Sequence, residues 1–358
     1  MASPRFHPLT ISAITPEAKN AVSLRFDVPD ALRARYQFTP GQYLTLRQVI
    51  DGAEQRRAYS ICAAPEDAEL RIAVKRVADG VMSSYLCDQA QIGDVIEVMT
   101  PTGRFGLTPD PARARNLVAF VAGSGITPVL SVLRSVLGRE PASRCTLFYA
   151  NRTTEEIMFR ETLESLKNRH LGRFSLLNIL SREEQDIPIL HGRLDAERIA
   201  SLLTRAVPGR IDDLFICGPE PMIDIVAQTA HAHGVGADAI HIERFIASHG
   251  GTPRPRPVFS PAPATGDAIV ALIADGKRHT IPIGPEETIL DAALRAGLDL
   301  PYACKGGMCA TCRARILEGH ATMALNYSLA DWEIKAGFVL SCQARIDGPG
   351  VVVDYDAL

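Results

Sequence analysis

Residues 304–312 read CKGGMCATC, and a fourth cysteine, Cys342, follows after a gap of 29 residues. Thiolates are strong ligands for soft transition metals, and short gaps let one loop wrap around such a centre. The two glycines let the backbone approach the centre closely and donate N–H groups to it. The predicted metal ligands are therefore Cys304, Cys309, Cys312 and Cys342, the last closing the site from another strand.

The spacing C-x4-C-x2-C resembles that of plant-type ferredoxins, which hold a [2Fe–2S] cluster through four thiolates. Tetrahedral zinc is the alternative, but its cysteines usually form two pairs with two to four residues between the members of each pair. An iron–sulfur cluster passes single electrons, so the rest of the chain should contain their source.

Length and composition narrow the possibilities further. A chain of 358 residues can form two or three domains, and its formal net charge of −3 gives no electrostatic reason to expect nucleic-acid binding. No apolar run approaches the length of a membrane span, and residues 1–10 lack the apolar stretch of a secretory signal. The remaining cysteines are scattered singly, as expected for reduced thiols in the cytoplasm: Cys62, Cys87, Cys145 and Cys217.

A stretch rich in proline and glycine divides the chain at residues 247–267. This composition predicts an extended, semi-rigid linker. The cluster cysteines all lie beyond it, in residues 268–358. We therefore expect a tethered cluster module that moves between an electron donor and an acceptor.

Residues 1–110 contain short strand-like runs separated by turn signals, which favour an antiparallel β-barrel. The runs are Thr10–Ile14, Val22–Val28, Tyr43–Val49, Arg57–Cys62, Leu70–Val77 and Val95–Met99. Residues 111–246 alternate strand and helix, which predicts an α/β domain with a parallel sheet. Its expected helices are Pro128–Leu137, Glu155–Lys167, Asp195–Arg205 and Met222–His233.

Three short motifs could bind phosphate or a ring. Residues 121–128, VAGSGITP, end an apolar strand and begin a helix. The glycines let a pyrophosphate approach the backbone, and the free N–H groups at the start of the helix can bind it. It is not the G-x-G-x-x-G fingerprint, and many such turns are only turns. Arg57, Tyr59 and Ser60 offer a cation, an aromatic face and a hydroxyl. The turn at 80–83 is a further phosphate seat at a predicted helix start.

The order of these motifs, followed by Cys217-Gly218-Pro219, resembles the ferredoxin–NADP reductase superfamily over residues 1 to about 245. The resemblance implies an FAD-binding antiparallel barrel and a nicotinamide-binding α/β domain, followed here by an α+β ferredoxin domain of the β-grasp type. It also implies the following cofactor contacts: Arg57, Gly80, Val81, Met82 and Ser83 at the FAD pyrophosphate, Tyr59 and Ser60 at the isoalloxazine, and Val74 and Lys75 at the adenosine.

The same resemblance assigns the nicotinamide side. Gly123, Ser124, Gly125, Thr127 and Pro128 would receive the dinucleotide, and Cys217, Gly218 and Pro219 would lie beside the nicotinamide. An isolated cysteine there would instead be a small buried apolar residue. Glu243 and Phe245 match the segment that approaches the flavin, whereas His241 is interpreted as structural. The predicted catalytic set is Tyr59, Ser60, Cys217 and Glu243.

The choice between NADPH and NADH depends on fewer residues. Arg152 follows one strand, and Ser181 and Arg182 follow the next, which resembles the 2′-phosphate loop of NADP-linked members. Glu183 and Glu184 beside them argue for NADH. NADPH is the preferred prediction, with NADH as the alternative.

A narrower resemblance spans nearly the whole chain and points to the reductase subunits of phenylacetyl-coenzyme A ring epoxidases. It is carried by residues 157–159, 191–195, 304–313, 323, 326–329, 337–344 and 351–356. It implies a diiron oxygenase partner, the epoxidase subunits of phenylacetate catabolism. Two alternatives stay open: a reductase of another oxygenase, such as a Rieske enzyme, and a redox sensor that only holds the flavin and cluster.

Overall fold

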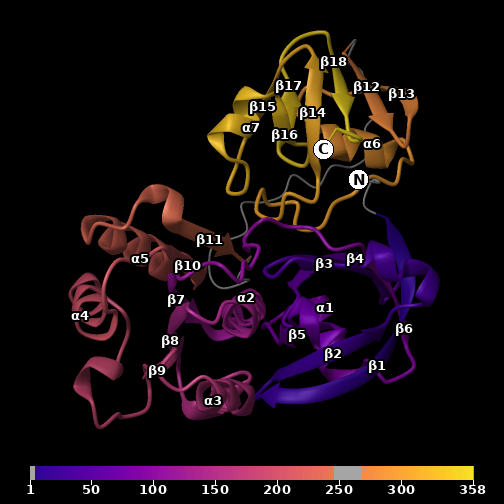
Figure 1. The fold of residues 1–358 in the computed structure, drawn as a ribbon. Coiled ribbons are helices and arrows are strands. Elements are labelled where there is room, and N and C mark those ends of the chain that lie inside the picture. The colour runs from indigo at the N-terminus through magenta and orange to yellow at the C-terminus, as the bar shows by residue number, and fades with distance from the viewer. Residues whose placement is uncertain (1–4, 246–267, 358) are drawn as a thin grey trace. The chain divides into compact units, whose positions relative to one another are not determined.

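The computed structural model describes residues 5–245 and 268–357, so the predicted linker at 247–267 lies outside the described residues. The chain forms two compact units. The larger unit contains nearly all of a β-barrel and a parallel sheet, and the smaller contains the module with the four cluster cysteines (Figure 1). In the described part of the chain, no helix is long and apolar enough to cross a membrane.

Six antiparallel strands form the first sheet, in the order β4-β3-β6-β1-β2-β5. A bridge between Ile61 and Ile72 joins the two edge strands, so the sheet closes into the predicted barrel. Helix α1 (Val81–Asp88) begins at the predicted turn. The strands are β1 (Phe6–Ala18), β2 (Ala21–Asp27), β3 (Tyr43–Ile50), β4 (Ala53–Ser60), β5 (Leu70–Lys75) and β6 (Val95–Met99).

The first strand is much longer than the predicted Thr10–Ile14. Its pairing with β2 shifts between Ile11 and Ala13 and again between Pro16 and Ala18. Such bulges absorb an extra residue and let a strand continue past a proline. The prediction therefore covered only the central part of β1.

The second sheet is parallel, with the order β11-β10-β7-β8-β9. Its strands are β7 (Asn116–Ala122), β8 (Arg144–Asn151), β9 (Phe174–Leu180), β10 (Asp213–Gly218) and β11 (Ile240–Arg244). Its helices are α2 (Ile126–Arg139), α3 (Arg160–Arg169), α4 (Ala196–Ala206) and α5 (Glu220–Ala232). The α/β prediction is confirmed, and this order is that of a doubly wound nucleotide-binding sheet.

The predicted helix Glu155–Lys167 is wrong at its start. A short 3-10 turn covers Thr154–Glu156, and α3 begins only at Arg160. Between them, Ile157, Met158 and Phe159 are buried in the core, and Phe159 has a left-handed φ of 57°. Packing of this apolar segment therefore overrides the helical periodicity.

Helices cover both faces of the parallel sheet (Figure 1). Side chains of α2 and α3 pack with Leu117, Ala119 and Val121 of β7, which alternate along the strand. Side chains of α4 and α5 pack with Val118 and Phe120 on the opposite face. The first of these cores also includes Ala21, Cys62, Ala73 and Phe105 of the barrel, so barrel and sheet share one buried interface.

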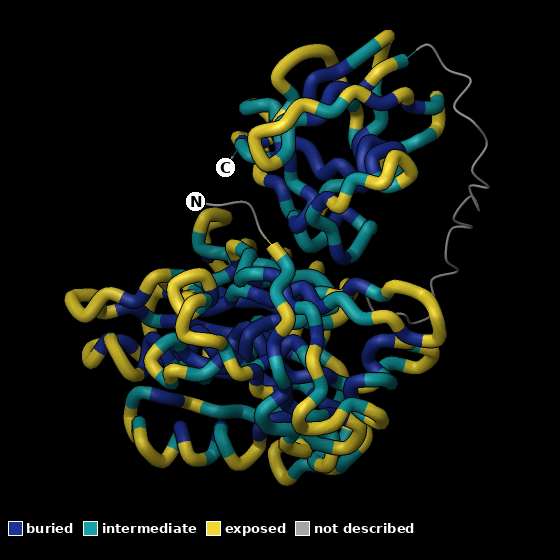
Figure 2. The backbone as a smooth tube through the Cα atoms, turned by 90° about the vertical axis from the view of Figure 1, so that its right-hand side faces the viewer, coloured by how far each residue is buried: buried dark blue, intermediate teal, exposed yellow. Residues whose placement is uncertain are grey.

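The smaller unit has a mixed sheet in the order β13-β12-β18-β14-β16 and a two-stranded sheet of β15 and β17. One helix, α6, packs into its core, as expected for a β-grasp ferredoxin fold. Figure 2 shows how each unit surrounds buried segments with exposed loops. The elements are β12 (Ile269–Ala274), β13 (Lys277–Pro282), α6 (Ile289–Arg295), β14 (Arg313–Glu318), β15 (Ala321–Met323), α7 (Asp331–Lys335), β16 (Phe338–Leu340), β17 (Ala344–Ile346) and β18 (Gly350–Asp354).

Candidate functional site

The site lies where the strand order of the parallel sheet reverses. Strand β7 pairs with β8 on one side and with β10 on the other, so the connections leaving β7 and β10 diverge. In doubly wound sheets, ligands bind at this switch point, beyond the carboxyl ends of the strands. Both strands end here in predicted motifs, at Gly123–Gly125 after β7 and at Cys217-Gly218 in β10.

Gly125 is required by close packing at this point. A Cβ at Gly125 would lie 2.3 Å from the carbonyl oxygen of Cys217 and 3.1 Å from its Sγ. Only a glycine therefore lets the start of α2 pack against the end of β10. Thr127 Oγ1 donates to the Ser124 carbonyl at 3.0 Å, and Tyr149 Oη donates to the Gly123 carbonyl at 2.9 Å, which together hold the turn.

Three predicted catalytic residues converge beside this turn. Cys217 of β10 is opposite Glu243 of β11, and Ser60 at the end of β4 approaches Glu243 from the barrel. Burial raises the pKa of Glu243 to about 8, and the Ser60 hydroxyl lowers it only in part. Burial also raises the pKa of the Cys217 thiol, and Glu243, where it is ionised, raises it further. Both side chains are therefore held protonated at neutral pH.

The remaining flavin residues lie along β4 and α1. Tyr59 is half-buried against the barrel core, while Arg57 is exposed and donates to the Arg56 carbonyl at 2.7 Å. Ser83 Oγ donates to the Gly80 carbonyl at 3.0 Å and accepts from the Val77 N–H at 3.2 Å. The Ser83 hydroxyl thus shapes the turn, leaving the first N–H groups of α1 as the donors for an anion.

The barrel strand predicted at the adenosine is tied to the nucleotide domain. Val74 and Met82 are buried in the barrel core, whereas Val81 is exposed. Lys75 Nζ is 2.8 Å from Glu156 Oε2 in the turn before α3. Burial opposes ionisation of Glu156, but Lys75, with Arg152 and Arg182, lowers its pKa below the usual value. This contact fixes β5 against the turn that follows β8.

The predicted 2′-phosphate residues do come together. Strands β8 and β9 pair up to Asn151 and Leu180, and the Arg182 N–H donates to the Arg152 carbonyl at 2.9 Å. Both arginines are exposed at this edge. Glu183 faces elsewhere, since its carboxylate accepts from the Thr154 N–H at 2.7 Å and from Thr154 Oγ1 at 2.6 Å.

One more polar residue, Asn151, lies at the same edge; the sequence placed it beside Arg152 after the same strand but gave it no role of its own. The side-chain nitrogen and oxygen of Asn151, the last residue of β8, are buried without a hydrogen bond of ordinary geometry. A buried amide without partners is costly unless a ligand satisfies it. A polar residue ending the apolar run TLFYA was the available signal.

The four cluster cysteines gather in two pairs, Cys304 with Cys309 and Cys312 with Cys342. Among the described residues, no group of three or more His, Cys, Asp or Glu side chains is close enough to hold a single metal ion. Four cysteines in two pairs fit the four thiolate ligands that a [2Fe–2S] cluster takes.

Hydrogen-bond donors surround the first pair. The N–H groups of Gly306 and Met308 lie 3.3 and 3.4 Å from Cys304 Sγ, and Thr311 Oγ1 donates to Cys309 Sγ at 3.2 Å. The contact with Cys309 is the main reason why the pKa of Cys304 is lowered to about 5, and the two N–H groups contribute. Such donors stabilise thiolates and the charge of a bound cluster.

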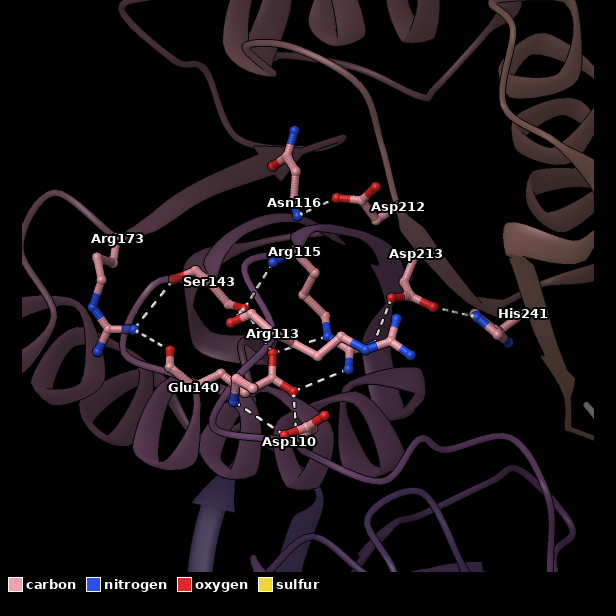
Figure 3. Close-up of polar contacts among 11 residues, drawn as sticks. Asp110, Arg113, Arg115, Asn116, Glu140, Ser143, Arg173, Asp212, Asp213 and His241 are labelled. Carbon is pink, nitrogen blue, oxygen red and sulfur yellow. Dashed lines mark hydrogen bonds and ion pairs between the residues drawn. The ribbon is translucent and has the colours of Figure 1, made fainter.

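His241 lies at the opposite, amino edge of the parallel sheet, within an ion-pair network (Figure 3). Its Nε2 is 2.9 Å from Asp213 Oδ1, and its ring stacks on Phe215 at 4.5 Å between centroids. Arg115 donates to Asp213 at 2.8 Å and to Glu140 at 2.9 and 3.0 Å. Although burial opposes it, His241 and Arg115 lower the pKa of Asp213.

Three family models match consecutive parts of the chain. Residues 8–106 match an oxidoreductase FAD-binding domain, 120–228 an oxidoreductase NAD-binding domain, and 272–347 a 2Fe-2S iron–sulfur cluster binding domain. The glycine turn at the start of α2 and the two pairs of cysteines fit these cofactors.

Curated relatives match along nearly their whole length. One subunit of the 1,2-phenylacetyl-CoA epoxidase from Escherichia coli K12 is 43% identical over 98% of both chains. The ferredoxin reductase component of 3-ketosteroid-9-alpha-monooxygenase from Rhodococcus rhodochrous is 34% identical over 94% of this chain and 93% of the relative.

Among solved structures, phthalate dioxygenase reductase, described as a modular structure for electron transfer from pyridine nucleotides to [2Fe-2S], matches with a TM-score of 0.60. It is 25% identical and covers 98% of both chains. The chain therefore belongs to the oxidoreductase family that joins an FAD-binding barrel, an NAD-binding domain and a 2Fe–2S domain, and that includes these oxygenase reductase components.

Proposed function

We propose that this chain takes a hydride from NADPH and delivers its electrons one at a time to a diiron oxygenase, the epoxidase that acts on phenylacetyl-coenzyme A. We infer the partner from the 43% identity, over 98% of both chains, to a subunit of the Escherichia coli epoxidase. A cytoplasmic location fits this role, since the eight cysteines are free of disulfides.

When bound, FAD accepts two electrons together and releases them singly, and the cluster carries one. Arg57 and the first N–H groups of α1 would hold the FAD pyrophosphate, with Tyr59 against the flavin ring. The turn at Gly123–Gly125 would hold the pyrophosphate of NADPH at the start of α2. Cys304, Cys309, Cys312 and Cys342 would ligate the two iron atoms.

Cys217 and Glu243 act in this proposal as neutral groups. A protonated thiol is a poor nucleophile, so Cys217 borders the nicotinamide without forming a bond to it. Glu243 keeps its proton up to about pH 8 and, beside Ser60, can hold a proton at the buried end of the flavin site. Their task is to exclude water and to orient the two rings for hydride transfer.

NADPH is favoured over NADH by the arrangement of charges after β8 and β9. Arg152 and Arg182 follow paired strand ends, and Ser181 precedes Arg182 with its N–H bonded to the Asn151 carbonyl at 3.0 Å. Glu183 would favour NADH if its carboxylate faced the ribose, but that carboxylate accepts hydrogen bonds from the Thr154 N–H and hydroxyl. A 2′-phosphate placed here would meet cations and a hydroxyl.

The test combines the purified chain with the epoxidase subunits, NADPH and phenylacetyl-coenzyme A, and follows the oxidised product by mass spectrometry. We expect product only when all components are present, together with one FAD, two irons and two acid-labile sulfides per chain. The Cys342→Ser variant is the matched control, since it should retain FAD and lose the cluster.

Other outcomes would redirect the assignment. Efficient reduction of a purified Rieske oxygenase, with none of the epoxidase, would make this the reductase of another oxygenase. Slow NADPH oxidation with every artificial acceptor would instead indicate a redox sensor.

A further inference from the structure

Gln343 follows the fourth cluster cysteine and reaches back to the loop after the first. Its amide Nε2 is 2.9 Å from the Lys305 carbonyl oxygen and 3.0 Å from the Cys342 carbonyl oxygen. Because both neighbours are acceptors, the amide nitrogen must face them, and they use its two protons. The same nitrogen is 3.8 Å from Cys342 Sγ, too far for a strong bond. The Gln343 side chain therefore joins two segments that supply cluster ligands.

The backbone of Gln343 is itself fixed. Its N–H donates to the Leu340 carbonyl at 2.8 Å, and its carbonyl accepts from the Ala324 N–H at 3.0 Å. The amide thus extends from a firmly held backbone, so it can fix the position of the Lys305 carbonyl.

The peptide unit that Gln343 holds also contacts a cluster ligand. A trans peptide unit is planar, so the Lys305 carbonyl and the Gly306 N–H point in opposite directions. The carbonyl accepts from Gln343, and the N–H donates to Cys304 Sγ at 3.3 Å. By holding one end of this peptide, Gln343 directs the other end toward the sulfur.

The conformation of this peptide needs such support. Lys305 has a left-handed φ of 48°, which costs a residue with a Cβ about 1 to 2 kcal/mol. Gly306 has no Cβ, so the peptide between them can rotate at little cost unless a contact holds it. The Lys305 ammonium pairs with Asp291 at 2.9 Å, which anchors the side chain but not the carbonyl.

A second N–H directed at Cys304, that of Met308 at 3.4 Å from Sγ, is supported twice at the other end of its peptide. There the Gly307 carbonyl accepts from the Tyr327 N–H at 3.1 Å and from the Ser328 hydroxyl at 3.3 Å. In the described part of the chain, the first peptide has one side-chain amide in that role. Loss of a single donor should therefore matter more at the first peptide than at the second.

We propose that Gln343 sets the reduction potential of the bound cluster by holding the Gly306 N–H on Cys304 Sγ. Reduction adds one electron, and so one negative charge, to the cluster. A donor at a ligand sulfur stabilises the reduced state more than the oxidised state. Gln343 is thus a positioning residue that acts through the 305–306 peptide, and its role rests on the cluster assigned to the four cysteines.

The test is the Gln343→Met variant, which keeps the length of the side chain and removes its donor. Reduced cluster is measured by electron paramagnetic resonance during an anaerobic redox titration of the full-length protein. We expect the ratio of reduced to oxidised cluster at a fixed potential to fall roughly three- to tenfold, tenfold being 59 mV for one electron. Electron–nuclear double resonance should show one fewer exchangeable proton coupled to the reduced cluster. The flavin potential should not change.

Ser328→Ala is the matched control. It also removes a side-chain donor from a carbonyl of the cluster loop, but the Tyr327 N–H still holds that carbonyl. The cluster potential should therefore stay at the wild-type value. If Gln343→Met retains full iron and titrates like Ser328→Ala, the proposal is wrong.

A second variant covers the case in which Gln343→Met loses iron. Gln343→Asn shortens the side chain by one methylene, so its amide falls short of the Lys305 carbonyl and the potential should shift in the same direction. A wild-type potential in this variant would overturn the proposal. Loss of iron from both variants, with FAD retained, would also overturn it, because Gln343 would then build the site rather than set its potential. Wild-type protein without iron after anaerobic purification would contradict the cluster itself, a failure distinct from that of Gln343.

Discussion

The two edges of the parallel sheet hold buried polar groups in opposite states. At the amino edge, Arg115, Glu140 and Asp213 satisfy one another through close ion pairs (Figure 3). At the carboxyl edge, Glu243 Oε2 and the Asn151 amide are buried without proper partners. Paired buried charges hold a fold together, whereas unpaired buried polar groups at a switch point are what a ligand would satisfy. The difference separates the stabilising edge from the candidate functional edge.

The largest predicted effect breaks the amino edge. Glu140 is fully buried and accepts from Arg115 and Ser143, so Glu140→Gln leaves part of the Arg115 charge uncompensated. We expect the free energy of unfolding to fall by roughly 3 kcal/mol or more. Unfolding in urea, monitored by the release of the flavin, measures this free energy of unfolding.

The control for this variant is Glu66→Gln, which breaks an exposed pair with Arg139 at 3.5 Å and should cost less than about 1 kcal/mol. The rate constant of flavin reduction by NADPH should stay near the wild-type value in Glu140→Gln. A large loss of that rate in folded protein would show that the two edges are not separable.

The second prediction changes the carboxyl edge. Glu243→Gln keeps the shape of a buried group without its titration, and we expect flavin reduction to slow by roughly tenfold or more. Stopped-flow absorbance with NADPH measures the rate constant. The exposed Glu197, on α4, provides the control Glu197→Gln. Equal rates for Glu243→Gln and the control would remove Glu243 from the functional edge.

The same carboxyl should make stability depend on pH. Its pKa is about 8 when folded and about 4.5 when unfolded, so the folded chain binds the extra proton in between. The stabilisation is fully present below pH 4.5 and is lost as pH rises to 8, by up to about 1.4 kcal/mol per pH unit. Denaturant unfolding between these values should show this slope in wild type and not in Glu243→Gln.

The smallest predicted effect concerns cofactor choice at the outer end of the functional edge. Arg182→Ala should lower kcat/KM for NADPH by roughly tenfold, about 1.4 kcal/mol, because it would remove the proposed charged contact to the 2′-phosphate. kcat/KM for NADH should change little. Steady-state assays with NADPH and with NADH measure both values of kcat/KM. Equal losses for the two cofactors would mean that Arg182 does not contact the phosphate.

Local patterns in the sequence predicted the three-part architecture and the cluster ligands. Cysteine spacing, the alternation of strand and helix, and the glycines before α2 each depend on neighbouring residues. The start of α3 was predicted wrongly because burial of Met158 and Phe159 depends on the rest of the core.

Contacts between distant segments could not be predicted in this way. Arg115, Glu140 and Asp213 each look like ordinary surface residues, and only the fold makes them a buried network. The hydrogen bond from Thr154 to Glu183, 29 positions away, likewise depends on how β8 and β9 pair.

The most direct test of the central claim follows the electrons in time. Anaerobic protein is mixed with NADPH, flavin bleaching is recorded by stopped-flow absorbance, and reduced cluster is recorded by rapid-freeze electron paramagnetic resonance. Our account predicts that bleaching precedes the cluster signal, and that Cys342→Ser bleaches at the wild-type rate without giving that signal. Cluster reduction by NADPH at an unchanged rate in protein stripped of FAD would contradict it.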